Sequence, residues 1–130
     1  MRRFLDTIDD PWMKKYNLLI EQAEAGKTFK GKLTLHHIIP RSVAPELAND
    51  KENWIWLPFK EHIDMHYWLW KHSKKFASQL WFGCVYGRKH GLWDLPGGEE
   101  EYEQLKQDLK LCRRLKSLSK LKELEGNERR

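Results

Sequence analysis

Two stretches decide the fold of this chain: LHHIIPRS at residues 35–42 and EHIDMH at residues 61–66. Adjacent side chains on a strand point to opposite faces, so the two histidines of the first stretch face different ways. Side chains four apart on a helix share one face, so the two histidines of the second stretch lie one above the other. These four of the chain's six histidines are His36, His37, His62 and His66.

This arrangement predicts a metal site. His36 on the strand can converge on one ion with the helix pair, His62 and His66, whereas His37 points away and stays free for proton transfer. A metal ion beside an unligated histidine is a common arrangement for hydrolysis. Imidazole ligands favour Mn²⁺, Ni²⁺ or Zn²⁺ over Mg²⁺. We expect one divalent ion, which is Mg²⁺, Mn²⁺, Ni²⁺ or Zn²⁺. The alternative for His36 is a hydrogen-bonded histidine of the core.

Around these stretches the sequence predicts strand, loop, strand and helix. Leu33 and Leu35 alternate with polar residues as in a strand, and Pro40 ends it because proline has no N–H to donate. Pro58 suits the first turn of the helix that follows. The expected bounds are 32–39 for the first strand, 41–52 for the loop, 54–57 for the second strand and 58–72 for the helix.

Further helices are expected on both sides of this core. Asp10 as N-cap and Pro11 as the first helical residue begin a helix over 11–25, and Gly26 ends it. Helical periodicity predicts two more helices, over 73–89 and 99–124, and a disordered tail. We therefore assign residues 1–130 to one domain. Its parts are an N-terminal helical segment at 1–32, a core at 33–72, C-terminal helices at 73–124 and a tail at 125–130.

Composition limits the class of protein. A chain of 130 residues suits a single domain with a modest core. The net charge of +5, from 24 Lys and Arg against 19 Asp and Glu, fits a polyanionic partner without requiring one. Cys84 and Cys112 form no Cys-x-x-Cys pair, which argues against a zinc knuckle. No apolar run has the length of a membrane span and no signal peptide is visible, so we expect a cytoplasmic protein without membrane contact.

In the order of these residues the chain resembles the HNH endonucleases, the ββα-metal nucleases. Their pattern is a pair ending in His, then two apolar residues and Pro, then Asn, then a His on a helix. In this chain the pair and the residues up to Pro are residues 36–40, the Asn is Asn53 and the helix His is His62. His66 is similar to the second helix histidine of colicin DNase domains, and the wider layout resembles small phage-encoded HNH proteins. The resemblance implies an α+β fold: a ββα-metal core, made of a short two-stranded antiparallel hairpin and a helix, flanked by additional α-helices.

The resemblance also implies an activity, metal-dependent hydrolysis of DNA phosphodiester bonds, by nicking or by cutting both strands. His37 matches the general base that activates water. His36 and His62 match metal ligands, as does His66, whose alternative is a contact to phosphate. Asn53 matches the central Asn, a side chain that can tie the loop backbone and hold the strand of the base in place. A phage or prophage source, and action in the host cell cytoplasm, are implied as well.

DNA is the partner that this resemblance implies. Arg41 and Lys60 are candidates for phosphate contacts, or else surface residues that only aid solubility. The apolar seam of the C-terminal helix leaves a homodimer open. A His-Glu-x-x-His protease is disfavoured because Ile63 follows His62 where that motif has Glu. The alternative that we keep is a non-catalytic DNA-binding module with a structural metal.

Overall fold

The computed structural model describes residues 1–5 and 9–128, and side chains as far as residue 119. The chain divides into two compact units, Met1–His72 and Ser73–Arg130. This division falls where the sequence places the end of the core and the start of the C-terminal helices. The assignment of the whole chain to one domain stays a prediction, and each unit is described by itself below.

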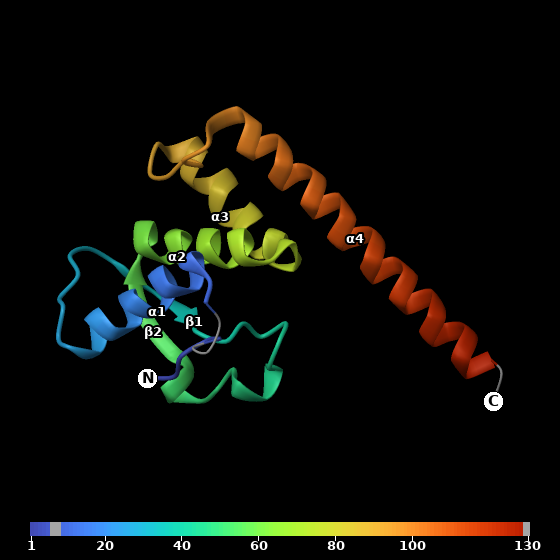
Figure 1. Cartoon of the computed structure of the whole chain (residues 1–130), viewed down its shortest axis with the longest axis horizontal. Coiled ribbons are helices and arrows are strands. Elements are labelled where there is room, and N and C mark those ends of the chain that lie inside the picture. Colours follow the sequence, from blue (N-terminus) through green and yellow to red (C-terminus); the bar gives the residue numbers. More distant parts are fainter. Residues whose placement is uncertain (6–8, 129–130) are drawn as a thin grey trace. The chain divides into compact units, whose positions relative to one another are not determined.

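In its described residues the first unit contains a two-stranded antiparallel hairpin, two α-helices and two short 3-10 helices, Pro45–Leu47 and Lys51–Asn53 (Figure 1). In the register of the hairpin, His36 lies opposite Ile55 and His37 opposite Trp54. Helix α2 packs against both strands and against α1. The elements are α1 (Pro11–Glu24), β1 (Leu33–His37), β2 (Trp54–Pro58) and α2 (Phe59–His72). The predicted α+β fold with a strand, loop, strand and helix core is confirmed.

The boundaries of these elements differ from those predicted by one or two residues, and two of the differences have a local reason. The first strand ends at His37 rather than at residue 39, because the N–H of Ile38 bonds the carbonyl of Asn53 and the N–H of Ile39 bonds the Asn53 side chain. Pro58 is the last residue of β2, opposite Leu33, and α2 begins one residue later. Proline is tolerated there because a strand of a two-stranded sheet has one edge that needs no donor.

The core of the first unit joins the apolar faces of the helices to the inner side of the hairpin. From α1 it takes Met13, Tyr16, Leu19 and Ile20. From α2 it takes Ile63, Met65, Tyr67, Leu69 and Trp70. From the strands it takes Ile55 and Leu57. His36 lies within this core with 1% of its surface exposed, so an ionisable ring is enclosed among apolar side chains.

The second unit is helical. Its elements are a 3-10 turn at Lys74–Phe76, α3 (Ala77–His90) and α4 (Gly98–Glu128) (Figure 1). The predicted helix 73–89 therefore begins with a separate turn, and its expected stop at Gly91 is confirmed by a left-handed φ of 66° there. Helix α4 is longer than the predicted 99–124 and takes in part of the expected tail, whereas residues 129–130 lie outside the described residues.

Helices α3 and α4 pack on each other near the start of α4. Leu105 and Leu109 are buried, and the rings of Trp81 and Tyr102 stack with centroids 5.6 Å apart. From residue 113 to residue 119 every residue is exposed.

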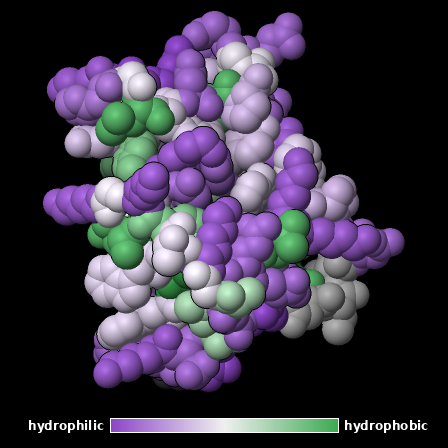
Figure 2. Space-filling model, turned by 90° about the vertical axis from the view of Figure 1, so that its left-hand side faces the viewer, coloured by the Kyte–Doolittle hydropathy of each residue, from purple (hydrophilic) through white to green (hydrophobic). Residues whose placement is uncertain are grey.

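One face of the molecule is mostly hydrophilic, with hydrophobic residues in small separate patches (Figure 2). Among the described residues, no helix combines the length and the apolar character that a membrane span requires.

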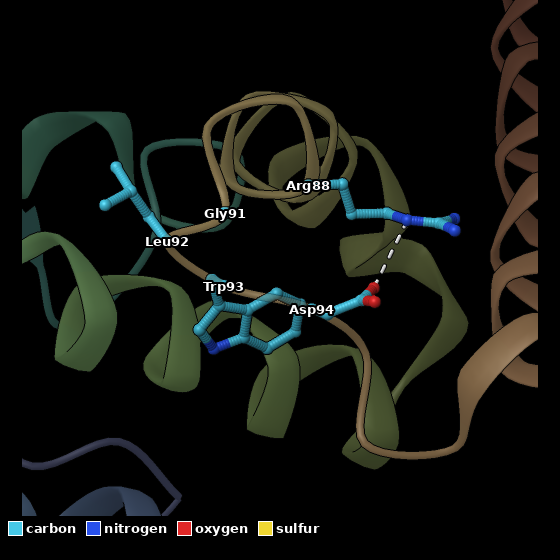
Figure 3. A pocket seen from close by; sticks show the side chains of 5 residues that line it. All are labelled: Arg88, Gly91, Leu92, Trp93 and Asp94. Atoms are coloured by element: carbon cyan, nitrogen blue, oxygen red, sulfur yellow. Dashed lines mark ion pairs between the residues drawn. The ribbon is translucent and has the colours of Figure 1, made fainter.

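A pocket of about 270 Å³ lies in the second unit. Its lining comes from the end of α3 and the loop that follows: Arg88, Gly91, Leu92, Trp93 and Asp94 (Figure 3). The guanidinium of Arg88 lies 3.3 Å from Asp94 and 2.6 Å from Glu99. The cation of the pocket is thus already neutralised by two carboxylates, and we assign the pocket no ligand.

The predicted N-cap of α1 can be tested directly. The Asp10 carboxylate accepts hydrogen bonds from the N–H groups of Trp12 and Met13 and from His72 Nδ1. We expect Asp10→Ala to lower the free energy of unfolding of the chain by about 1–2 kcal/mol, the usual cost of a lost N-cap. Asp10→Asn keeps the cap oxygen and should cost less. Urea unfolding, followed by circular dichroism, measures both.

The effect of Asp10 should also depend on pH. The hydrogen bond with His72 lowers the pKa of Asp10 from 3.8. A carboxyl group with a lowered folded-state pKa stabilises the fold above the unfolded-state pKa, and this contribution is lost as the pH falls through the folded-state pKa. The difference in stability between wild type and Asp10→Asn should therefore shrink as the pH falls below about 4. An equal difference at pH 7 and pH 3 would contradict the role of the charged carboxylate.

Candidate metal centre and catalytic site

Three histidines from two elements meet in the first unit. His36 comes from β1, and His62 and His66 come from successive turns of α2. Each offers one ring nitrogen, and these three nitrogens all lie within 4.8 Å of one another. The ring centroids are 5.0 Å apart for His36 and His62, and 4.8 Å apart for His36 and His66. The structure thus brings together the three residues that the sequence predicts as metal ligands.

Burial keeps these rings neutral. It lowers the pKa of His36 well below 6.5, and the neighbouring histidines add to the effect. Burial, with the charge of His62, lowers the pKa of His66 to about 3. The pKa of His62 is lowered as well, by burial first and by His37 second. Because a metal ligand must be an unprotonated imidazole, all three are ready to bind a cation at neutral pH.

The hydrogen bonds of the rings fit a metal ion. Within the described part of the chain, Nδ1 of His36 and Nδ1 of His66 are buried without a hydrogen-bond partner. A buried nitrogen without a partner is costly, and coordination of a cation would remove that cost. Three imidazoles, with no carboxylate among the clustered residues, suit Zn²⁺, Ni²⁺ or Mn²⁺ better than Mg²⁺. The residues present therefore fit the divalent ion that the sequence predicts.

His37 is held by a different contact. It follows His36 on β1, is partly buried, and its Nε2 lies 3.1 Å from the backbone carbonyl of Ala48. A carbonyl oxygen can only accept, so Nε2 carries the proton and Nδ1 keeps the lone pair. A ring fixed in this way has a free basic nitrogen, which is what general-base chemistry needs.

Asn53 holds the loop between the strands. Its side chain is fully buried and accepts a hydrogen bond from the N–H of Ile39 at 2.8 Å. Its amide nitrogen donates to the carbonyls of Ile39 at 3.0 Å and Leu47 at 3.4 Å. One amide thus joins the residues just after His37 to the far side of the loop, which is the kind of contact that the sequence predicts for it.

The two candidates for phosphate contacts are both exposed. Arg41 lies in the loop directly after Pro40. Lys60 lies on the first turn of α2, and its ammonium is 2.9 Å from the Asp64 carboxylate. A contact of Lys60 with phosphate would have to compete with this ion pair. An exposed pair at i,i+4 is worth only a few tenths of a kcal/mol, so this ion pair is a weak competitor.

Two residues of the site were not predicted from the sequence. The Tyr16 hydroxyl lies 2.7 Å from Nε2 of His36, and the Thr34 hydroxyl lies 2.7 Å from Nδ1 of His62. Tyr16 fits the apolar stripe of α1 and Thr34 fits the alternation of β1, so neither stands out by spacing. The available signal is chemical: each is a hydroxyl on the inner face of an element that carries or covers a histidine.

Comparison with known proteins gives one match. Residues 26–59 match the family model described as HNH endonuclease. This segment holds the hairpin, His36, His37 and Asn53, and it ends before His62 and His66, so the two helix ligands rest on the geometry of α2. No curated protein and no solved structure matches the chain. The likeness to colicin and phage proteins therefore stays a prediction, whereas the predicted resemblance to the HNH endonucleases is confirmed over residues 26–59.

Proposed function

We propose that this protein is a metal-dependent endonuclease that hydrolyses DNA phosphodiester bonds. The observation that carries the proposal is the convergence of His36, His62 and His66 directly beside His37, whose Nδ1 is free to take a proton. The HNH match supports a nuclease. A histidine cluster alone would fit many metalloproteins, but the cluster together with the HNH segment favours this reaction.

The residues divide the work of hydrolysis. His37 takes a proton from water, and the water oxygen attacks the scissile phosphorus. Its hydrogen bond to Ala48 fixes the ring orientation during this transfer. Asn53 keeps the loop in place behind it. The bound ion would supply positive charge to the phosphate and to the leaving 3′ oxygen.

DNA contacts beyond the site would come from basic side chains. Arg41 and Lys60 flank the histidines in the sequence and are exposed. A net charge of +5 favours association with a polyanion. Helix α4 carries three exposed leucines at helical spacing: Leu111, Leu115 and Leu118. These side chains could form the contact of a homodimer. A phage source and a cytoplasmic site of action stay predictions from the resemblance.

The alternative is a DNA-binding module whose metal is structural. In that case His37 would have no chemical role. The hydrogen bond of His37 to Ala48 would be consistent with both functions, but a ring with one nitrogen bonded to the backbone and the other nitrogen free is better explained by catalysis than by packing. The two proposals differ in a measurable way, since only the enzyme needs His37 to cut DNA.

The metal assignment predicts one tightly bound divalent ion per chain. His36→Ala and His62→Ala should each weaken Zn²⁺ binding by more than the roughly 100-fold that an outer residue costs. His66→Ala should also weaken it, by less if this residue contacts phosphate instead. Isothermal titration of the apo protein measures affinity and stoichiometry. His90→Ala, an exposed histidine of the second unit, is the matched control. Unchanged affinity and stoichiometry in the first two variants would refute the assignment.

The enzyme and the binding module are separated by His37→Ala. We expect plasmid cleavage to fall by roughly 10²–10⁴-fold, the usual contribution of a general base, or about 3–5 kcal/mol of transition-state stabilisation. Metal binding and DNA affinity should stay close to those of the wild type. The assay is plasmid nicking across Mg²⁺, Mn²⁺, Ni²⁺ and Zn²⁺, with His90→Ala again as the control.

Each other outcome of that assay has a definite meaning. Loss of the metal in His37→Ala would show that the roles of His36 and His37 are exchanged. Full cleavage with the metal retained would show that another group activates the water. A wild type that binds DNA and metal but cuts nothing with any of the four ions would favour the structural module.

A further inference from the structure

We infer that Tyr16 and Thr34 are positioning residues, which fix the tautomers of His36 and His62 so that each presents an unprotonated nitrogen to the metal. The inference rests on the proposed metal site for its consequence, but its hydrogen-bond part concerns the protein alone. It is carried by two hydroxyl groups, each of which lies between a histidine ring and a backbone carbonyl.

The Tyr16 hydroxyl has two close neighbours. Its oxygen is 2.7 Å from Nε2 of His36 and 2.6 Å from the carbonyl oxygen of Ile38. A phenol has one proton to donate and a carbonyl can only accept, so that proton goes to Ile38. The contact with His36 then requires the ring to donate, which puts the proton on Nε2 and leaves the lone pair on Nδ1. Nδ1 of His36 is the buried nitrogen without a partner.

The Thr34 hydroxyl repeats this arrangement on the second ligand. Its oxygen is 2.7 Å from Nδ1 of His62 and 2.9 Å from the carbonyl oxygen of Leu57. The threonine proton goes to the carbonyl, so Nδ1 of His62 must carry the proton of the ring. The lone pair of His62 is therefore on Nε2. The two histidines are held in opposite tautomers, and each tautomer is set by a hydroxyl whose own proton is already committed.

This reading makes α1 a part of the metal centre. Tyr16 is fully buried and comes from α1, which ends before the segment that matches the HNH family begins. The HNH segment and α2 supply the ligands, whereas the orientation of His36 depends on a residue outside both. Outer contacts of this kind fix the ring and raise the basicity of the ligating nitrogen.

The first test reads the tautomers without any variant. Long-range ¹H–¹⁵N correlation spectra of the metal-free wild type at pH 7.5 distinguish a protonated Nδ1 from a protonated Nε2 in each histidine. We expect His36 with its proton on Nε2 and His62 with its proton on Nδ1. The reverse tautomer at His36 in the folded wild type would overturn the inference.

The second test measures the consequence. Tyr16→Phe and Thr34→Val remove the hydroxyl and keep the shape of the side chain. We expect each to weaken Zn²⁺ binding by roughly 10–100-fold, the usual cost of an outer contact, and to mix the tautomers of its own histidine only. Competition with a chelator gives the affinity. The matched controls are Tyr102→Phe in the second unit and Thr28→Val on the surface, which should bind Zn²⁺ as the wild type does.

The outcomes separate this inference from the proposed function. Affinities equal to wild type in both hydroxyl variants would refute the positioning role even if the protein proves to be a nuclease. A variant that fails to fold leaves the decision to the spectra of the wild type. The expected tautomers in a wild type that takes up no divalent ion would support the hydrogen-bond assignment and refute the proposed metal function.

Discussion

The site depends on one constraint: an imidazole must be kept inside an apolar core. His36 is almost fully buried, and burial strongly favours its neutral form. A neutral imidazole still has one donor and one acceptor, and both must be satisfied in the core. Tyr16 takes the donor, and the acceptor Nδ1 is without a partner. A bound metal ion would satisfy this nitrogen, so the stability of the folded chain and the proposed chemistry favour the same occupant of the site.

Backbone carbonyls set the orientation of the histidines. His36 reaches the carbonyl of Ile38 through Tyr16, and His62 reaches that of Leu57 through Thr34. His37 reaches the carbonyl of Ala48 directly. A carbonyl never donates, so the direction of each hydrogen-bond chain is fixed once the backbone is folded. The fold, and not a metal ion, therefore determines which ring nitrogen of each histidine keeps its lone pair.

Much of this centre could be predicted because it follows from short periodicities. The i,i+4 spacing of His62 and His66, and the adjacency of His36 and His37, are local facts that survive folding. The contact of Tyr16 with His36 crosses 20 residues and two elements, and no spacing rule reaches that far. The ion pair of Lys60 with Asp64 is different: it lies at i,i+4 and could have been read from the sequence.

Other departures arise from tertiary contacts that override a local preference. Pro58 suits a helix start, but pairing with Leu33 keeps it in the strand. Ile38 and Ile39 have strand-forming side chains, yet their backbone groups are taken by Asn53.

These hydrogen bonds of Asn53 also affect the position of His37. By ending the strand directly after His37, Asn53 turns the chain into the loop that carries Ala48, whose carbonyl accepts from both Nε2 of His37 and Nε1 of Trp54. Trp54 lies opposite His37 in the hairpin, so the carbonyl that orients His37 is itself fixed by the neighbouring strand. The role of Asn53 is thus geometric: it closes a loop whose far side holds His37, the proposed general base, in one tautomer.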